Sequence, residues 1–381
     1  MMRIAYVCTD PGIPVFGSKG ASIHVQEMLR AFLKLGAGVT LFSPSMDDPI
    51  LADLTGVRRH PLTPEKPAGK ADAEARARQQ LGLNRTVAEA LEAEGPFDLV
   101  YERHALFAHA AMEWAREKGL PSILEVNAPL IAEQKQHRSL ACEAEAVEAT
   151  GRAMQAAAHV IAVSPAVADY CASFGAKARV VPNGVNPDRF ASPARHDGPF
   201  TVGFLGTLKP WHDVDTLIEA FGLLAPDLPD ARLLVVGEGP ERERLEARLA
   251  AMGLADKARF TGAVPADRVA AELAQMSVGI ACYRQDQPFY FSPLKLYEYM
   301  AAGLPVVVSR TGGLEDLTAA GCFGPDVPPE DPPALAAALA GLAADPARRA
   351  AMGAAARDHV LRHHSWDGIA RDLLARAGVG T

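Results

Sequence analysis

The chain has 381 residues, of which 49% are apolar and 22% are charged, and its formal net charge is −8. This length exceeds one ordinary hydrophobic core, so we expect two domains, and the composition excludes an intrinsically disordered protein. The acidic balance argues against a nucleic-acid-binding protein, because such proteins usually carry a basic face. The five cysteines are scattered and lack metal-site spacing, which predicts reduced core residues in a cytoplasmic protein.

The first part of the chain has the pattern of a βαβ unit. We predict a strand over 3–8, a glycine-containing loop, a helix over 22–35 and a strand over 39–42. Gly17 and Gly20 in the loop let the backbone approach phosphates or an acceptor, with a plain surface turn as the alternative. They do not form the dinucleotide-binding pattern Gly-x-Gly-x-x-Gly, so a nicotinamide-dependent dehydrogenase is disfavoured. The strand starts at Arg3, so no signal peptide is expected.

Polar residues follow the next two predicted strands, over 98–101 and 122–126. Glu102, Arg103 and His104 come after the first strand, and Asn127 comes after the second. In an open parallel sheet the carboxyl ends of strands meet at one edge, where ligands bind. We therefore expect one of Glu102, Arg103 and His104 to bind or orient a substrate. Asn127 either binds a hydroxyl group or stabilises the turn before Pro129.

A Pro-, Asp- and Gly-rich linker over 191–199 divides the chain, and a second alternating set follows it. Its predicted strands cover 200–205, 232–236, 258–261 and 278–281, with a helix over 213–224 and further helices at the C-terminal end. Asp213 and Asp215 spell the Asp-x-Asp of metal-dependent transferases, but acids at a helix start need no metal to explain them. The pattern predicts two doubly wound, Rossmann-like α/β domains that face each other across a cleft.

One stretch of the second set predicts an anion-binding helix start. Ser292 is a good N-cap and Pro293 suits the first helical position; helix-favouring residues continue to 302, and Gly303 ends the helix. The backbone N–H groups at Ser292 and Leu294 would face an anion at the positive end of the helix dipole.

Two charged residues of the same helix extend this prediction. Lys295 adds a positive charge in the first turn, and Glu298 lies about 9 Å along the axis from the cap. This spacing suits a nucleoside diphosphate, with the phosphates at the helix start and the ribose hydroxyls on Glu298. The alternative is an amphipathic helix in which Lys295 and Glu298 form a solvated pair.

Several further segments resemble one known family. They include Val181-Pro-Asn-Gly-Val185, Asp215-Thr-Leu-Ile-Glu-Ala-Phe221, Val236-Gly-Glu-Gly-Pro240, Phe260-Thr-Gly-Ala-Val264 and Leu296-Tyr-Glu-Tyr-Met-Ala-Ala-Gly-Leu-Pro-Val306, and Ser365-Trp366 completes the set. In this order the chain resembles the retaining glycosyltransferases of family 4, which have the GT-B fold. The resemblance implies an N-terminal acceptor-side domain over 1–190, a nucleotide-sugar-donor domain over 199–362, and a final helix over 363–381 that packs back on the N-terminal domain.

The chain departs from the family pattern near the donor diphosphate. Thr207 stands at the usual arginine position and His212 at the usual lysine position, so Lys209 and Lys295 are the candidate cations. A solvated loop lysine is the alternative for Lys209. Tyr290 stands where the family often has an acid that contacts the transferred sugar, while Glu298 matches the second acid.

The resemblance implies a metal-independent, retaining transfer from a nucleotide-diphosphate sugar, without a cofactor, to a saccharide or lipid-linked acceptor in envelope polysaccharide or glycolipid assembly. A GT-B-fold epimerase and a non-catalytic nucleotide-sugar-binding protein stay open. We expect a cytoplasmic protein, since no apolar run approaches the roughly 18 residues needed to span a bilayer. Lys135, His137 and Arg138 are too few for a basic amphipathic face, so peripheral contact with the inner membrane face stays open.

Overall fold

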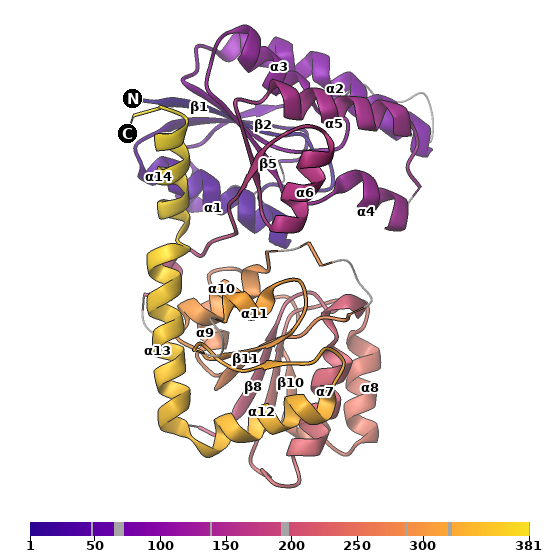
Figure 1. The fold of residues 1–381 in the computed structure, drawn as a ribbon, viewed down its shortest axis with the longest axis vertical. Helices are drawn as coiled ribbons and strands as arrows, with labels where there is room; N and C mark the ends of the chain where they lie inside the picture. The colour runs from indigo at the N-terminus through magenta and orange to yellow at the C-terminus, as the bar shows by residue number, and fades with distance from the viewer. Residues whose placement is uncertain are drawn as a thin grey trace. The chain divides into compact units, whose positions relative to one another are not determined.

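The computed structural model describes residues 1–46, 49–64, 72–137, 139–191, 198–285, 289–290, 292–318 and 322–380. Most of the predicted linker, residues 192–197, lies outside the described residues, as do Arg138 and Phe291. The chain divides into two compact units (Figure 1). Unit 1 consists of Met1–Asn183, Tyr290–Ser292 and Trp366–Thr381, and unit 2 consists of Gly184–Phe289 and Pro293–Ser365.

Unit 1 contains a parallel sheet whose described strands have the order β3-β2-β1-β4-β5-β6-β7. The order reverses at β1 and β4, which is the topological switch point where open α/β sheets bind ligands. The strands are β1 (Arg3–Cys8), β2 (Gly38–Ser43), β3 (Arg58–Pro61), β4 (Leu99–Arg103), β5 (Ser122–Val126), β6 (His159–Ala162) and β7 (Ala178–Val180).

Helices cover both faces of this sheet. One face packs on α2, α3, α5 and α6 through a core that includes Val7, Val100, Leu124 and Leu91. On the other face α14 lies beside α1 (Figure 1), and Lys34 of α1 forms an ion pair with Asp367 of α14 at 3.2 Å. The helices are α1 (Gly20–Lys34), α2 (Ala73–Glu94), α3 (Ala110–Glu117), α4 (Leu130–His137), α5 (Glu143–Ala156), α6 (Pro165–Ser173) and α14 (Trp366–Arg376).

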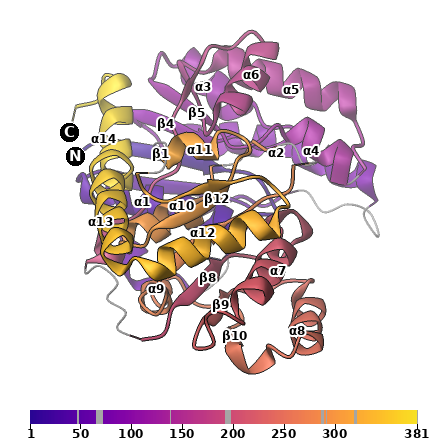
Figure 2. The ribbon, with the colours of Figure 1, turned by 60° about the horizontal axis from the view of Figure 1, so that its bottom comes forward.

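Unit 2 is a second parallel α/β unit, and its described strands have the order β10-β9-β8-β11-β12-β13. Alternate strand residues feed two cores because side chains of a strand point to opposite faces. Phe204 belongs to the core under α7 and α12, which lie side by side in Figure 2, whereas Leu205 belongs to the core under α10 and α13. The strands are β8 (Thr201–Leu205), β9 (Arg232–Val236), β10 (Ala258–Phe260), β11 (Val278–Ala281), β12 (Val306–Ser309) and β13 (Asp326–Val327).

The α-helices of unit 2 are α7 (Val214–Leu224), α8 (Arg242–Ala251), α9 (Val269–Leu273), α10 (Leu294–Ala301), α11 (Leu314–Leu317), α12 (Pro332–Ala344) and α13 (Pro346–His363). The predicted α/β fold, with two parallel sheets covered by helices, is confirmed. Within the described ranges no helix is long and apolar enough to cross a membrane.

Several predicted element boundaries are shifted, and two of the shifts concern candidate site residues. Strand β4 continues through Glu102 and Arg103 because these residues pair with Val7 and Cys8 of β1, so they lie in the strand and not after it. Ser292 does not cap α10, since the N-cap residue is Pro293 in an extended conformation and no side chain caps this helix end. Gly303 follows the helix with a φ of 78°, as its predicted role requires.

Candidate functional site

In unit 2, the loops after β8 and β9 are in direct backbone contact. Gly206 N–H donates to Val236 O at 2.9 Å, and Leu208 N–H donates to Glu238 O at 3.0 Å. Gly237 has a φ of 146°, and a Cβ atom there would lie 1.9 Å from Gly206 O. Only glycine fits this position, because a side chain would collide with backbone that cannot move aside. The Gly-Glu-Gly sequence after β9 therefore allows the close packing of these two loops, which lie beside Lys295.

Lys295 of α10 is buried beside the loop that follows β8. Its side chain places Nζ 4.2 Å from the ring centroid of Phe204 and 5.3 Å from that of Tyr283, and Nζ has no hydrogen-bond partner. A Cβ on Gly206 would lie 3.1 Å from the same Nζ. Burial lowers the pKa of Lys295 to about 7. The alternative of a solvated lysine is therefore wrong, and a buried amine of this kind is suited to an anionic ligand.

His212 lies next to Lys295 and is not a second cation. Its Nδ1 donates to Thr207 O at 2.5 Å, and its ring centroid lies 5.5 Å from that of Tyr283. Burial, and then the charge of Lys295, lower the pKa of His212 to about 3, so the ring is neutral at pH 7. Lys209, the other predicted cation, lies with its ammonium 5.7 Å from the ring centroid of Trp211.

The predicted ribose-binding residue has an arginine partner. Glu298 of α10 forms an ion pair with Arg189 at 3.2 Å, and Arg189 also donates to Ala266 O at 2.6 Å. Arg189 lies at the end of a short 3₁₀ turn, Pro187–Phe190, which begins at Asn186. Our sequence reasoning gave Arg189 no role, because no spacing connects it to a residue so far along the chain. The ion pair holds the Glu298 carboxylate in one orientation.

Ser292 contacts unit 1 residues instead of the helix that follows it. Its hydroxyl accepts the backbone N–H of Asn183 at 2.8 Å, and its carbonyl accepts from Asn183 Nδ2 at 2.6 Å. The hydroxyl is thereby occupied, which explains why it does not cap α10. Pro293 and Leu294 belong to unit 2, so the three residues predicted as one phosphate site are divided between the two units.

Tyr290, which stands where the resemblance implied an acid, also belongs to unit 1. Its carbonyl accepts the Ser164 hydroxyl at 2.8 Å. Burial, and then Glu133, raise the pKa of the phenol well above its usual value. Tyr290 is therefore a neutral group held in unit 1 and does not replace the acid.

At the switch point of unit 1, Arg103 lies beside a buried carboxylate. Arg103 and Glu125 pair across β4 and β5, and the guanidinium Nη1 lies 3.7 Å from Glu125 Oε2. The other carboxylate oxygen lies 2.6 Å from His24 Nε2 of α1. Burial opposes ionisation, but His24 and then Arg103 hold the pKa of Glu125 at about 2. Our sequence reasoning assigned no role to His24 or Glu125.

The glycine loop before α1 is held from within unit 1. Gln26 donates from Nε2 to Val15 O and to Gly17 O, both at 2.8 Å. A Cβ on Gly17 would lie 3.0 Å from Pro14 O, so the turn is tight. Gly20 is the first residue of α1 and is exposed.

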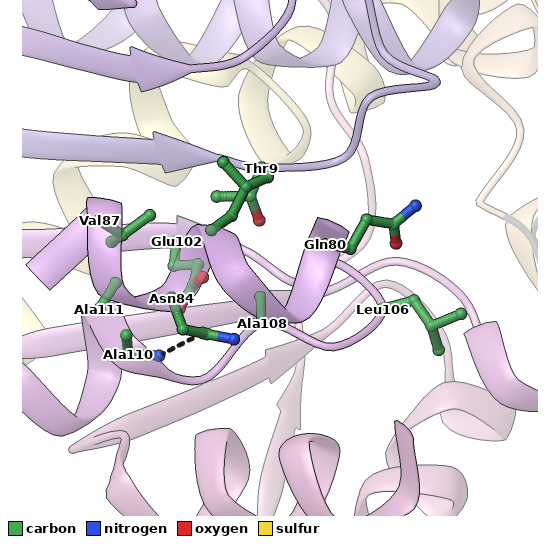
Figure 3. A pocket seen from close by; sticks show the side chains of 10 residues that line it. Thr9, Gln80, Asn84, Val87, Glu102, Leu106, Ala108, Ala110 and Ala111 are labelled. Carbon is green, nitrogen blue, oxygen red and sulfur yellow. Dashed lines mark hydrogen bonds between the residues drawn. The ribbon is translucent and has the colours of Figure 1, made fainter. Parts of the chain in front are cut away.

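Glu102 points to the opposite face of β4 from Arg103, as consecutive strand residues must. It lines a cavity of about 10 Å³ together with Thr9 and Asn84 (Figure 3). Glu102 Oε2 and Thr9 Oγ1 have no hydrogen-bond partner, and the space suits about one water molecule. Burial raises the pKa of Glu102 to about 8, so the group is mostly protonated at pH 7. Glu102 is thus separated from Arg103.

His104 and Asn127 keep unsatisfied polar atoms near the same sheet edge. His104 is 5% exposed, both of its ring nitrogens lack partners, and burial lowers its pKa to about 4. Asn127 Nδ2 is buried without a partner. Buried polar atoms are nearly always satisfied in native proteins, so these atoms are suited to a hydroxyl-rich ligand.

Of the two acids of the Asp-x-Asp sequence, Asp215 is paired with arginine side chains of α8. Helix α7 begins at Val214, and Asp215 accepts two hydrogen bonds from Arg244, at 2.8 and 2.6 Å. Asp213 precedes the helix in the left-handed conformation. In the part of the chain that the structure describes, no group of three or more His, Cys, Asp or Glu side chains is placed to hold a metal ion.

Comparison with known sequences decides the family. The model described as "Glycosyltransferase Family 4" matches residues 18–189, and the model described as "Glycosyl transferases group 1" matches residues 199–345. A D-inositol 3-phosphate glycosyltransferase of Stackebrandtia nassauensis is 30% identical over 94% of this chain and 86% of the relative. The chain belongs to glycosyltransferase family 4. The predicted family is confirmed.

Another relative of this family 4 chain matches over a shorter stretch. A GDP-mannose-dependent alpha-(1-6)-phosphatidylinositol monomannoside mannosyltransferase of Mycolicibacterium smegmatis is 32% identical over 52% of this chain, and the match spans 56% of that relative's length.

Solved structures share the fold of the family 4 chain. Sucrose-phosphate synthase of Thermosynechococcus elongatus has a TM-score of 0.75 at 22% identity, with 99% of this chain and 98% of that chain covered. The Anabaena protein HepE in complex with UDP has a TM-score of 0.73 at 18% identity, with 99% and 100% covered. The two structures support the two-sheet α/β architecture.

Proposed function

We propose that the chain is a retaining, metal-independent glycosyltransferase. It would move a sugar from a nucleotide-diphosphate sugar to a hydroxyl acceptor in the assembly of an envelope polysaccharide or glycolipid. The observation that carries the proposal is the buried, unpartnered ammonium group of Lys295 beside Gly206. A cation held in a low-dielectric site is costly unless an anion joins it, and the donor diphosphate is such an anion.

The proposed donor contacts lie in unit 2. The diphosphate would lie against Lys295 and the N–H group of Leu294, with Lys209 as an additional charge. The neutral His212 ring already donates from Nδ1 to Thr207 O, so its Nε2 could only accept a hydrogen bond, for example from a sugar hydroxyl group. Glu298, oriented by Arg189, would accept the ribose hydroxyl groups. Lysine supplies point charge without the bidentate geometry of arginine, so it suits a diphosphate whose charge increases as the bond breaks.

In the reaction, the bond between the anomeric carbon and the diphosphate oxygen breaks, and the acceptor oxygen forms the new bond on the same face of the sugar. The leaving diphosphate keeps the bonding electrons, and Lys295 stabilises its developing charge. The acceptor hydroxyl gives its proton to the departing diphosphate oxygen as it attacks. Arg103, His104 and Asn127 would bind sugar or acceptor hydroxyl groups through their unsatisfied polar atoms.

The named relatives indicate which donors to test first. One relative is GDP-mannose-dependent, and one solved structure of similar fold holds UDP. We therefore propose GDP-mannose and UDP-hexoses as the first donors, with inositol-containing or lipid-linked saccharides as acceptors. A lipid-linked acceptor would bring the cytoplasmic protein to the inner face of the membrane.

A thermal-shift panel of GDP, UDP, ADP and their sugars, without added metal and with EDTA present, tests the proposal. A site-specific ligand stabilises by about 2.7 kcal/mol at a hundredfold excess over Kd. We expect one base to raise the melting temperature of the wild type but not of Lys295→Met. Turnover with a matching acceptor should then give a product with the anomeric configuration of the donor. No shift with any nucleotide would refute the proposal, donor conversion without an acceptor would indicate an epimerase, and binding without turnover would indicate a non-catalytic protein.

A further inference from the structure

A chain of contacts in unit 1 leads from the C-terminal helix to Arg103. Trp366, the first residue of α14, is 3% exposed and contacts the His24 ring edge-on at a centroid distance of 4.7 Å. His24 Nε2 lies 2.6 Å from Glu125 Oε1, and both residues are buried. Glu125 Oε2 then lies 3.7 Å from Arg103 Nη1. All four residues belong to the same unit, although they come from α14, α1, β5 and β4.

Glu125 lies closer to His24 than to Arg103. The His24–Glu125 contact is a short hydrogen bond, whereas the Glu125–Arg103 distance is too long for one. Neither Glu125 Oε2 nor Arg103 Nη1 has a hydrogen-bond partner. The carboxylate therefore balances the charge of the guanidinium and leaves the Nη1 group available to a ligand. A carboxylate bound directly to Arg103 would compete with substrate for the same donors.

The other ionisable groups around Glu125 carry no competing charge. Tyr6 and Tyr101 face it with rings stacked at 5.1 Å, and burial, followed by Glu125 itself, raises the pKa of each phenol well above its usual value. Burial also raises the pKa of Cys8, which lies beside Arg103, to about 12. The local electrostatic balance thus depends on Glu125, Arg103 and His24.

We propose that Glu125, held by His24, is a positioning residue that fixes the Arg103 guanidinium for contact with substrate, and that Trp366 fixes His24. The role of Arg103 rests on the proposed function. In this arrangement Trp366 of α14 is the residue of the contact chain that lies farthest from Arg103. His24 keeps the carboxylate from rotating toward Arg103. The guanidinium is therefore oriented by the carboxylate, and its Nη1 group can still bind substrate.

A double-mutant cycle on kcat tests whether Glu125 acts through Arg103. Glu125→Gln keeps the shape and removes the charge, and we expect it to lower kcat by about tenfold to 100-fold, with the Kd of the nucleoside diphosphate unchanged. In an Arg103→Ala background the same change should cost nothing further, because coupled residues are non-additive. If the loss of kcat in the double variant equals the product of the losses in the two single variants, the proposal is overturned.

The chain offers a matched control for Glu125. Glu113 also lies between a histidine and an arginine, 2.9 Å from His109 Nδ1 and 2.8 Å from Arg152 Nη2, in the same unit. It is a helix carboxylate outside the proposed substrate contacts, so Glu113→Gln should leave kcat within about twofold. An equal loss of kcat in Glu113→Gln would mean that any broken carboxylate pair in unit 1 has this effect, and would overturn the specific role.

Rescue by conservative variants tests the outer contacts. His24→Gln can still donate to Glu125 and should keep more activity than His24→Ala. Trp366→Phe keeps an aromatic contact and should exceed Trp366→Ala in the same way. If the conservative and the alanine variants lose kcat equally while melting alike, the proposed contacts do not position Arg103.

A readout without turnover separates this inference from the proposed function. In protein with ¹⁵N-labelled arginine, Arg103→Lys identifies the Arg103 side-chain signal. We expect Glu125→Gln and His24→Ala to move that signal and Glu113→Gln to leave it in place; an unmoved signal in the first two variants would overturn the proposal. Absence of nucleotide binding and turnover in the wild type would refute the enzymatic function, whereas this signal alone decides the positioning.

Discussion

The affinity for a nucleoside diphosphate should fall steeply with pH because Lys295 loses its charge just above neutrality. Burial lowers the pKa of Lys295 to about 7 in the free protein. Only the protonated amine attracts the diphosphate, and the bound anion stabilises that form, so the bound-state pKa must be higher. If it is about 10 or higher, Kd should rise about 50-fold between pH 7 and pH 9, which corresponds to about 2 kcal/mol.

The pH window isolates Lys295 from its neighbours. A terminal phosphate has its second pKa near 6, so the charge of the ligand is nearly constant above pH 7. Burial, and then the charge of Lys295, lower the pKa of His212 to about 3. Burial raises the pKa of Cys282, whose charge acts on Lys295, to about 12. Neither of these neighbours changes charge between pH 7 and pH 9.

Isothermal titration calorimetry at constant ionic strength, with the diphosphate identified in the thermal-shift panel, measures this effect. Lys295→Met should bind weakly at every pH, and the wild type should approach its affinity at pH 9. Lys295→Arg, whose charge is permanent, should show no pH dependence in this range. A wild-type Kd that is constant from pH 7 to pH 9, or a Lys295→Met variant with the wild-type slope, would refute the reasoning.

Three further outcomes are expected. Glu298→Ala should raise the donor KM and lower kcat, and Arg189→Ala should do the same more weakly because it only orients the carboxylate; unchanged kinetics in Glu298→Ala would remove this residue from the site. Burial raises the pKa of Glu102 to about 8, so the wild type loses stability as the pH rises from about 4.5 to about 8. In urea unfolding, the free energy of unfolding of Glu102→Gln relative to the wild type should increase by about 2 kcal/mol between pH 6 and pH 7.5. Parallel pH curves for the two proteins would contradict this prediction. Gly237→Ala should lower the stability of the protein by about 2 kcal/mol or more, because the new Cβ collides with the backbone at Gly206. Gly341→Ala lies in a helix with open space around it and should stabilise the protein slightly. Melting curves of the two variants measure both effects.

Much of the fold could be predicted because its strands are apolar runs bounded by turn residues. The strands Arg3–Cys8, Arg232–Val236 and Val278–Ala281 were predicted with the same bounds that the structure has. The prediction was weaker where pairing partners decide the end of an element. Strand β4 includes Glu102 and Arg103 because β1 pairs with them, and no local pattern reports such a partner. The two-residue strand β13 is too short to produce an alternating pattern.

The candidate site could be predicted only in part. The glycine loops and Lys295 are visible as a motif, because backbone geometry and charge leave local signatures in the sequence. The partners of the predicted residues come from distant segments: Arg189 for Glu298, and His24 for Glu125. Burial is also a property of the folded chain, so the pKa of Lys295 could not be read from its neighbours in sequence.

The division of the chain has a consequence for the order in which the protein can fold. Unit 1 needs Tyr290–Ser292, which are made after most of unit 2, and Trp366, which begins α14. During synthesis His24 therefore lacks its aromatic neighbour until the final helix has emerged, by which time the sheet of unit 2 can already be complete. Unit 1 therefore gains this packing contact between Trp366 and His24 only after all of unit 2 has been synthesised.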